Sequence, residues 1–346
     1  MRDRRFPAAA GSTFTVHESA GKRDTRFRQE RRKGELQDGP SGRSPDLTRR
    51  RFLTRLTQLG FLTLAPLGLP VWRRTAHSAP TPQPLSTAEG TDAAALVREV
   101  VGKLGGMGRF VSPGDRVVVK PNLGWDRTPE EAANTHPEVL AELCRLALDA
   151  GAGEVRVFDR TCNDARRTYQ RSGANDALGA FGSKVRLEHV NDNRFEVTDI
   201  PGAEKLTRWP LYRPALEADV LINAPVLKHH GLSGVTIGMK NLMGVMGGNR
   251  GRVHQGIDEN LVDLNLAVRS HLTVVDATRI LTRNGPQGGG TGPVRIANRM
   301  AACADVVTAD AWGAREFGTT PLDVGHIRRA HERGLGIADL DRVQVL

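Results

Sequence analysis

Side chains suited to chemistry are concentrated in residues 219–248, DVLINAPVLKHHGLSGVTIGMKNLMGVMGG. An apolar run opens there into a glycine-containing segment with Lys228, His230, Lys240 and Asn241. Glycine lets a ligand approach backbone N–H groups, and lysine offsets negative charge. The segment therefore predicts a site for a small anion, either a carboxylate or a phosphate, at the end of a buried strand.

Lysine is scarce after residue 80, where 26 of the 32 basic residues are arginine and six are lysine. Three of these six are Lys120, Lys228 and Lys240, and each lies beside a Pro, His or Asn. A buried ammonium group can lose its proton, whereas a guanidinium group stays charged. We therefore expect the three lysines to bind substrate or to move a proton. The alternative is that their stems pack at strand ends with the charged heads in water.

Histidines supply the remaining acid–base candidates. Because imidazole titrates near neutral pH, His230 and His254 are predicted to act with Lys240 as the catalytic groups. His136 lies in an Asn-Thr-His-Pro segment at the start of an expected helix, where backbone N–H groups favour an anion. His136 is therefore a candidate for binding substrate, together with Asn122.

A divalent metal is an alternative use of the same groups. Asp159 and Asp276, each after an expected strand, combine with His230 and His254 to give the imidazole and carboxylate donors that such metals accept. No H-E-x-x-H spacing supports this set, and an aspartate after a strand often caps a turn. The three cysteines lack a C-x-x-C pair, so we expect neither a zinc finger nor an iron–sulfur cluster.

Strands and helices alternate after residue 91, which predicts an α/β fold with a mostly parallel sheet and helices on both faces. In such sheets ligands bind beyond the carboxyl ends of the strands, where Lys120, Asp159 and Asp276 are expected. Thr135 and Glu138 form an expected capping box, and residues 185–215 an expected antiparallel insertion. The expected helices are 92–104, 137–150, 257–269, 305–317 and 325–333, and the expected strands are 117–119, 155–158, 220–222, 272–275 and 342–346.

The first eighty residues carry the whole net charge of +10, and the rest of the chain sums to zero. A basic surface for nucleic acid is therefore not expected in the folded region. The run Thr48-Arg49-Arg50-Arg51-Phe52-Leu53, followed by a moderately apolar stretch, is typical of a twin-arginine signal. That apolar stretch is too interrupted to form a stable membrane-spanning helix.

These features divide the chain into four parts. Residues 1–47 are expected to be a disordered extension or to precede the true start site, and residues 48–78 a signal peptide. Residues 79–91 are an expected linker, and residues 92–346 a single α/β domain. The protein would then meet the twin-arginine translocase during export, become periplasmic or otherwise extracytoplasmic, and keep no stable membrane span after cleavage.

Several short motifs together resemble the domain-of-unknown-function 362 family over about residues 95–345. Some members of that family carry ferredoxin-like cysteine clusters, which this chain lacks, so an electron-transfer role is not implied. The matching motifs are Lys120-Pro121-Asn122, Asn134-Thr135-His136-Pro137, Asn223 to Lys228, His230, Gly234-Val235-Thr236, Lys240-Asn241-Leu242-Met243-Gly244 and His254. The resemblance implies substrate-binding positions at Lys120, Asn122, His136, Lys228, Thr236, Asn241 and Gly244.

Two functions fit these observations. The first is an exported enzyme that acts on a small anionic substrate, with a divalent metal as a compatible cofactor. The second is a non-catalytic extracytoplasmic protein that binds a ligand or carries a cofactor in the same loops. The absence of G-x-x-x-x-G-K-[ST] and G-x-S-x-G motifs makes a P-loop nucleotide site and a hydrolase elbow unexpected.

Overall fold

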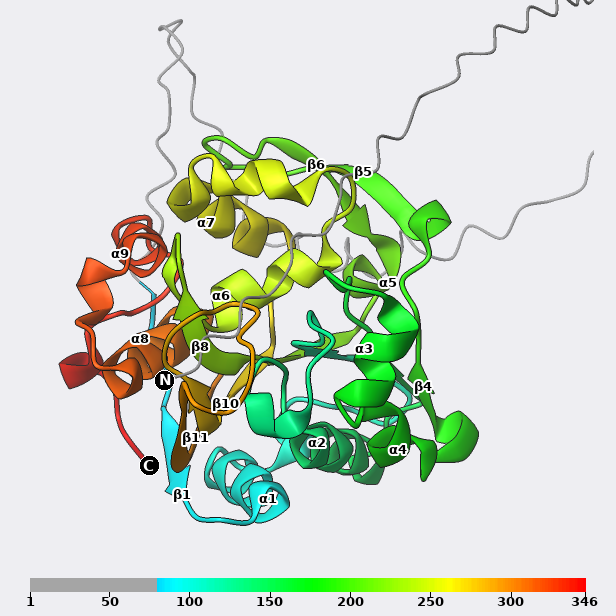
Figure 1. The fold of residues 1–346 in the computed structure, drawn as a ribbon. Coiled ribbons are helices and arrows are strands. Elements are labelled where there is room, and N and C mark those ends of the chain that lie inside the picture. Colours follow the sequence, from blue (N-terminus) through cyan, green and yellow to red (C-terminus); the bar gives the residue numbers. More distant parts are fainter. Residues whose placement is uncertain (1–79) are drawn as a thin grey trace, which may run out of the picture. The chain divides into compact units, whose positions relative to one another are not determined.

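Short runs of β-branched residues build the centre of the fold, which a computed structural model describes for residues 80–346 (Figure 1). Strands that are apolar on both faces can be stable only when helices cover both faces. The strands are β1 (Ser86–Glu89), β2 (Arg116–Pro121), β3 (Glu154–Val157), β4 (Val185–Leu187), β5 (Phe195–Asp199), β6 (Arg208–Tyr212), β7 (Val220–Ala224), β8 (Val226–His230), β9 (Gly234–Thr236), β10 (Leu272–Leu281) and β11 (Val294–Cys303).

The large sheet has the strand order β1-β11-β10-β7-β2-β3-β4, and β8 pairs with β10 and β9. The pairs from β10 through β7, β2 and β3 to β4 are parallel, as is the pair of β8 with β10. Strand β11 runs antiparallel to β10 and β1, and β9 antiparallel to β8. The prediction of a mostly parallel sheet is thus confirmed.

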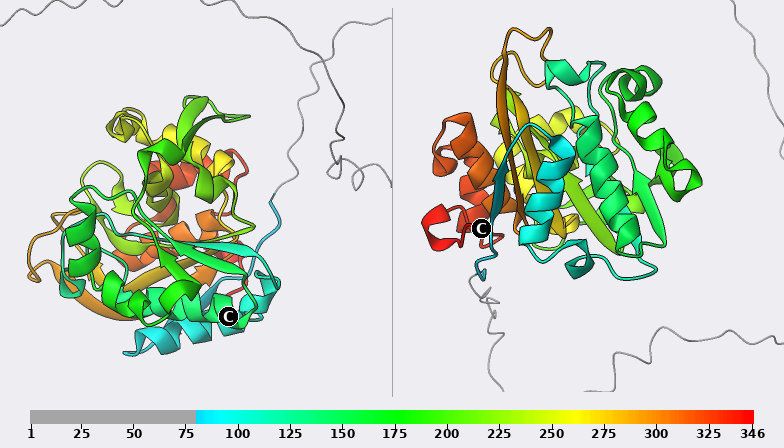
Figure 2. Two further views of the ribbon diagram at one scale, coloured as in Figure 1. Left: turned by 90° about the vertical axis from the view of Figure 1, so that its right-hand side faces the viewer. Right: turned by 90° about the horizontal axis from the view of Figure 1, so that it is seen from below.

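Helices cover the sheet on both faces (Figure 2). The helices are α1 (Ala93–Lys103), α2 (Pro137–Asp149), α3 (Ala165–Arg171), α4 (Ala174–Gly179), α5 (Arg213–Leu216), α6 (Gly238–Asn241), α7 (Ile257–Ala267), α8 (Val306–Phe317) and α9 (Gly325–Glu332). Five of them match the helices expected from the sequence, with ends that differ by one or two residues. The other four helices, α3, α4, α5 and α6, are short and were not predicted from the sequence.

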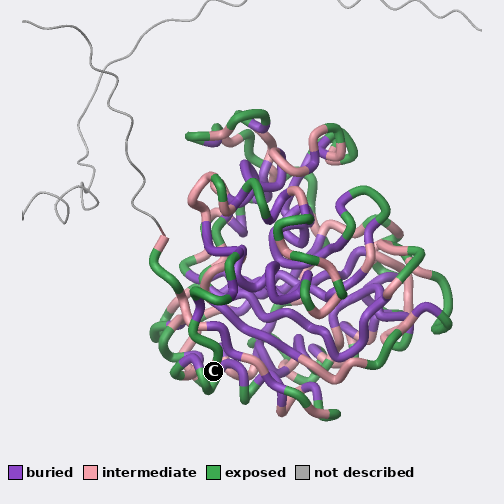
Figure 3. Tube along the Cα trace, turned by 90° about the vertical axis from the view of Figure 1, so that its left-hand side faces the viewer, coloured by how far each residue is buried: buried purple, intermediate pink, exposed green. Residues whose placement is uncertain are grey.

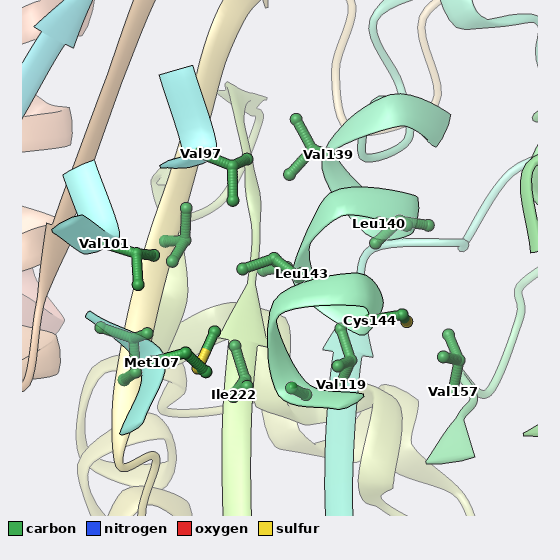
Figure 4. Close-up of a cluster of buried hydrophobic side chains, with 14 of the residues drawn as sticks. Val97, Val101, Met107, Val119, Val139, Leu140, Leu143, Cys144, Val157 and Ile222 are labelled. Carbon is green, nitrogen blue, oxygen red and sulfur yellow. The ribbon is translucent and has the colours of Figure 1, made fainter. Parts of the chain in front are cut away.

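The core follows the two-residue period of the strands. Val119 of β2 and Ile222 of β7 pack with Leu143 of α2 on one face (Figure 4). Val118 of β2 lies in a separate cluster on the other face, with Leu261 of α7. Neighbouring side chains of one strand thus reach opposite helix layers, as alternation along a strand requires. Figure 3 shows the central strands buried and the connections at the rim exposed.

Residues 185–215 combine two kinds of structure. Strand β4 joins the edge of the large sheet in parallel to β3. Strands β5 and β6 form a separate two-stranded antiparallel sheet, with Phe195 opposite Tyr212 at one end. The expected antiparallel insertion is therefore confirmed for the second half of this segment.

Four expectations differ from the structure. The linker prediction for residues 79–91 is wrong at Ser86–Glu89, because these residues pair with β11 as an edge strand. The capping box is wrong, because the side chain of His136, not Thr135, accepts from the Glu138 N–H at the start of α2. Strand β10 continues past Asp276 to residue 281, so this aspartate is internal. Residues 342–346 contribute only a bridge between Val345 and Leu85.

The predicted disordered extension and signal peptide lie outside the described residues. Within residues 80–346, no helix has both the length and the apolarity needed to cross a membrane.

The fold predicts a large stability cost for Asp263→Ala. The buried Asp263 carboxylate of α7 accepts from the backbone N–H groups of Glu204, Lys205 and Leu206 and from the Arg333 guanidinium at 2.7 Å. Removal leaves these donors buried and unpaired, so we expect a loss of roughly 3 kcal/mol in the free energy of unfolding. Urea unfolding measures it. Asp199→Ala, in an exposed ion pair, is the control and should cost less than about 1 kcal/mol.

Candidate functional site

The β8–β9 hairpin supplies three of the predicted site residues. Lys228 lies opposite Thr236 in the antiparallel register, and His230 lies two residues further along β8. Because side chains two apart on a strand share a face, this short hairpin presents an ammonium group, an imidazole and a hydroxyl together. All three line one cavity of about 190 Å³.

That cavity collects most of the residues predicted from the sequence. They come from the carboxyl ends of β2 and β3, from the hairpin, and from the segment that follows it. The predicted residues that line the cavity are Asn122, Asp159, Lys228, His230, Thr236, Lys240, Asn241, Gly244 and His254.

A chain of buried amides ties these elements together. Asn122 donates to the Asn241 side-chain oxygen at 3.0 Å, and Asn241 donates to the Asn223 side-chain oxygen at 2.8 Å and to the Lys120 carbonyl. Asn223 in turn donates to the Gly238 carbonyl at 2.9 Å. Each amide is oriented by the next, so the ends of β2 and β7 are fixed relative to α6.

Helix α6 is anchored from the other side by Asp310 of α8. The Asp310 carboxylate accepts from the N–H groups of Gly238 at 2.6 Å and Met239 at 3.0 Å. A Cβ atom at Gly238 would lie 2.8 Å from this carboxylate, so only glycine allows the close approach. The anchored turn places Lys240 and Asn241 at the cavity.

Lys228 is a buried ammonium without a carboxylate partner among the described residues. Its Nζ donates to the Asn122 side-chain oxygen at 3.0 Å and to the Ala133 carbonyl. Burial lowers the pKa of Lys228 to about 7, with smaller contributions that include the charge of Lys240. A substantial fraction of this amine is therefore neutral at physiological pH.

Lys240 has even fewer partners. Its Nζ contacts the Met243 sulfur at 3.5 Å, and within residues 80–346 no ion pair includes it. Burial lowers the pKa of Lys240 to about 8, and the nearby Arg250 charge contributes to the shift. The cavity thus holds a second ammonium that a bound anion would stabilise.

His230 and His254 stack with ring centroids 5.7 Å apart and planes 11° apart. The His230 Nδ1 accepts from the N–H groups of Leu232 at 3.1 Å and Ser233 at 3.2 Å, which places the proton of the neutral ring on Nε2. Burial, followed by the Lys240 charge, lowers the pKa of His230 to about 3. Burial also lowers the pKa of His254. His230 is therefore a neutral N–H donor at pH 7.

Lys120 lies beneath the cavity floor rather than in its lining. Its buried Nζ pairs with the Asp159 carboxylate at 2.9 Å, and burial lowers the pKa of Lys120. Gly244 packs directly over this pair, since a Cβ atom there would lie 1.8 Å from the Asp159 oxygen and 2.6 Å from Lys120 Nζ. Lys120 therefore neutralises Asp159, the one carboxylate that lines the cavity in the described part of the chain.

Two predicted site residues lie elsewhere. The His136 side chain caps α2, and its backbone N–H donates to Asp276 at 2.8 Å. Asp276 also accepts from the Thr278 hydroxyl and backbone, so its carboxylate organises the start of α2 instead of the cavity. Neither residue lines the cavity.

The predicted metal set is not assembled because Asp276 is absent from the cavity. Across residues 80–346, no three His, Cys, Asp or Glu side chains are grouped so that they could hold a metal ion. The donors that do meet at the cavity are mainly cationic groups and amides, which suit an anion rather than a cation.

Sequence reasoning missed several lining residues, above all Arg160, Arg250 and Cys162. Arg160 donates to the carbonyls of Met246 and Gly248, and Arg250 donates to the Arg160 carbonyl at 2.6 Å. The chain is rich in arginine, so no compositional signal separates these two from solvated ones. Only contacts between distant loops bring them to the site.

Comparisons with known proteins confirm the family that the sequence motifs resemble. The model of a domain of unknown function, DUF362, matches residues 117–315. The chain belongs to this family. A thylakoid-associated protein of Synechocystis sp. is 31% identical over 224 residues, which cover 62% of this chain and 67% of that protein.

Two solved structures show more distant likeness. The lactate racemase apoprotein from Thermoanaerobacterium thermosaccharolyticum aligns with a TM-score of 0.43 and 10% identity, over 67% of this chain and 56% of the racemase chain. A Thermotoga maritima protein aligns with a TM-score of 0.39 and 12% identity, over 72% of this chain and 59% of that one. This chain therefore spans little more than half the length of either structure.

The lowered pKa of Lys240 predicts that Lys240→Met stabilises the protein at neutral and acidic pH. Between the folded pKa of about 8 and the ordinary value of 10.5, the unfolded chain binds more protons, so the wild type gains stability as pH rises through this window. Methionine removes the cost of the buried charge, which is up to roughly 3 kcal/mol below pH 8 and disappears above about pH 10.5.

Urea unfolding of the full chain at about pH 6.5 and pH 9.5 measures this difference. Lys184→Met, at an exposed position, is the matched control and should change stability by less than about 0.5 kcal/mol at both pH values. A loss of stability in Lys240→Met at pH 6.5 would show that the ammonium is not a buried, unpaired charge.

Proposed function

We propose that the protein is an enzyme that binds a small carboxylate or phosphate anion and transfers a proton to or from it. The observation that carries this proposal is Lys228, an ammonium group that is buried without a carboxylate partner in the described chain and faces a cavity. A permanent structural role would favour an ion pair, because an isolated buried charge is costly. A bound anion supplies the missing partner.

Charges around the cavity support an anionic ligand. Lys228, Lys240, Arg160 and Arg250 all line it, while Asp159 is already neutralised by an ion pair beneath the floor. Opposite charges attract more strongly in a partly buried site than in water. An incoming carboxylate or phosphate would therefore be held by ammonium and guanidinium groups without competition from a free carboxylate.

Lys228 is a better candidate than His230 for the base that accepts a proton from the substrate. In the neutral amine both hydrogens are donated, one to the Asn122 oxygen and one to the Ala133 carbonyl. The lone pair is then not used in these hydrogen bonds and can accept a proton. A pKa of about 7 provides this neutral form at working pH. His230 instead offers its Nε2–H as a hydrogen-bond donor to a bound anion, which differs from the acid–base role expected from the sequence.

Anion binding should therefore be coupled to proton uptake. A bound anion raises the pKa values of Lys228 and Lys240, which are about 7 and about 8 in the empty site, so up to about one proton enters near pH 7.5. Affinity should fall by about tenfold or more from pH 7 to pH 9. Isothermal titration calorimetry with phosphate and small carboxylates, in buffers of different ionisation enthalpy, measures both effects; pH-independent affinity would contradict them.

Catalysis is tested separately by hydrogen–deuterium exchange in D2O. Nuclear magnetic resonance should detect exchange at an acidic C–H of small oxo-carboxylates with the wild type and Lys184→Met, and an exchange rate at least tenfold lower with Lys228→Met. Binding of these anions without exchange would favour a non-catalytic binding protein. Failure of every anion to bind would reject the proposed function altogether.

We also propose export by the twin-arginine route, on the pattern Thr48 to Leu53. The translocase recognises the arginine pair itself, so replacing Arg49 and Arg50 together by lysine should abolish export although the charge is unchanged. Cell fractionation of the full chain measures the result, with Arg26→Lys and Arg28→Lys as the matched control pair. Equal export of the double variant would exclude this route.

A further inference from the structure

Cys162 lies where two arginine-bearing loops meet at the cavity. It follows β3, lines the same cavity as Lys228 and Lys240, and is exposed to solvent. Its sulfur receives a hydrogen bond from Arg250 Nη2 at 3.1 Å, and its backbone N–H donates to the Gly124 carbonyl at 2.8 Å. A thiol that is exposed beside cationic groups can react as a nucleophile, whereas a thiol buried in an apolar core is inert.

A second observation indicates that a ligand binds in this part of the cavity. The hydroxyl of Thr236 also lines the cavity, yet it is buried and has no hydrogen-bond partner. The residue is only 3% exposed, so solvent does not readily satisfy its hydroxyl. A buried donor of this kind costs free energy unless a bound group accepts from it. Lys240, which has only a sulfur neighbour, adds a charged donor to the same space.

The other two cysteines lack this environment. Cys144 of α2 is fully buried in the core, and burial raises the pKa of its thiol. Cys303 is also buried, and burial raises the pKa of its thiol to about 12. In the folded protein they are inert internal references for the reactivity of Cys162.

We propose that Cys162 is a nucleophile that adds reversibly to the carbonyl carbon of a small carboxylate-bearing aldehyde or ketone and so holds it covalently in the cavity. This substrate class rests on the proposed anion site, which would hold the carboxylate through its arginine and lysine groups. Thr236 and Lys240 then supply donors for the carbonyl oxygen, where negative charge develops during the addition.

The step is balanced without an oxidant or a reductant. The Cys162 thiol gives its proton to the neutral amine of Lys228, and the sulfur forms a bond to the carbonyl carbon. The carbon–oxygen π bond breaks, its electron pair moves to the oxygen, and that oxygen takes a proton from the Lys240 ammonium. The product is a hemithioacetal or hemithioketal, and the reverse sequence releases the substrate.

Alkylation rates of the full chain test the nucleophile. Iodoacetate carries the carboxylate that the site should hold, whereas iodoacetamide has the same leaving group and no charge. Mass spectrometry of the peptides should show modification of Cys162 and not of Cys144 or Cys303. Relative to free glutathione, the ratio of iodoacetate to iodoacetamide rates at Cys162 should be at least about tenfold higher.

Two lysine variants distinguish the effect of a positive charge in the cavity from that of a positive charge elsewhere on the protein. Lys240→Met should lower the iodoacetate preference at least about fivefold, because one cation of the anion site is lost. Lys184→Met removes the same charge at an exposed position and should leave the preference unchanged. Glyoxylate labelled with carbon-13 at the aldehyde should give a hemithioacetal resonance with the wild type and none with Cys162→Ala.

The outcomes distinguish this inference from the proposed function. If phosphate and carboxylates bind as predicted but iodoacetate shows no preference for Cys162 and glyoxylate forms no adduct, the nucleophile is rejected and the anion site remains. If Cys162 reacts with both reagents in the ratio of glutathione and no anion binds, both proposals fail. Equal labelling of Cys144 or Cys303 would likewise reject a special reactivity at Cys162.

Discussion

The site depends on one constraint, the need to satisfy every polar group in a buried chain of amides. Lys228, Asn122, Asn241 and Asn223 are linked in sequence by side-chain hydrogen bonds of 2.8 to 3.0 Å. An amide that moved would leave buried donors and acceptors unpaired on two neighbouring elements. The chain therefore fixes the ends of β2, β7 and β8 and the short helix α6 in one arrangement, and the cavity is the space between them.

That arrangement concentrates positive charge at the cavity, and the burial of this charge lowers the stability of the folded protein. Burial lowers the pKa values of Lys228 and Lys240. The Lys240 charge also lowers the pKa of Lys228, and both ammonium charges lower the pKa of His230. Burial lowers the pKa of Lys120 as well, but Asp159, which pairs with it beneath Gly244, opposes this shift. Shifted pKa values of this kind are common at functional sites, where a bound ligand supplies the compensating charge.

Lysine usage explains why much of the site could be predicted. The three lysines selected from the sequence, Lys120, Lys228 and Lys240, are buried, whereas Lys103, Lys184 and Lys205 are exposed. The alternation of strands and helices likewise predicted the sheet, because the spacing of apolar residues in each segment identifies it as a strand or a helix and indicates its buried face. Arg160, Arg250 and Cys162 carried no such signal, because they reach the cavity through loop contacts. Asp276 was misplaced because the length of β10 depends on its pairing with β11.

The presence of lysine as well as arginine at the cavity favours the proposed proton transfer over simple anion binding. A site selected only to hold an anion gains nothing from a group that loses its charge near pH 7, and arginine would stay charged at every physiological pH. The cavity already contains two such permanent cations, Arg160 and Arg250. Lys228, with its two hydrogens directed to Asn122 and Ala133, adds a titratable amine beside them. This division between fixed and exchangeable charge is what proton transfer to a bound anion requires.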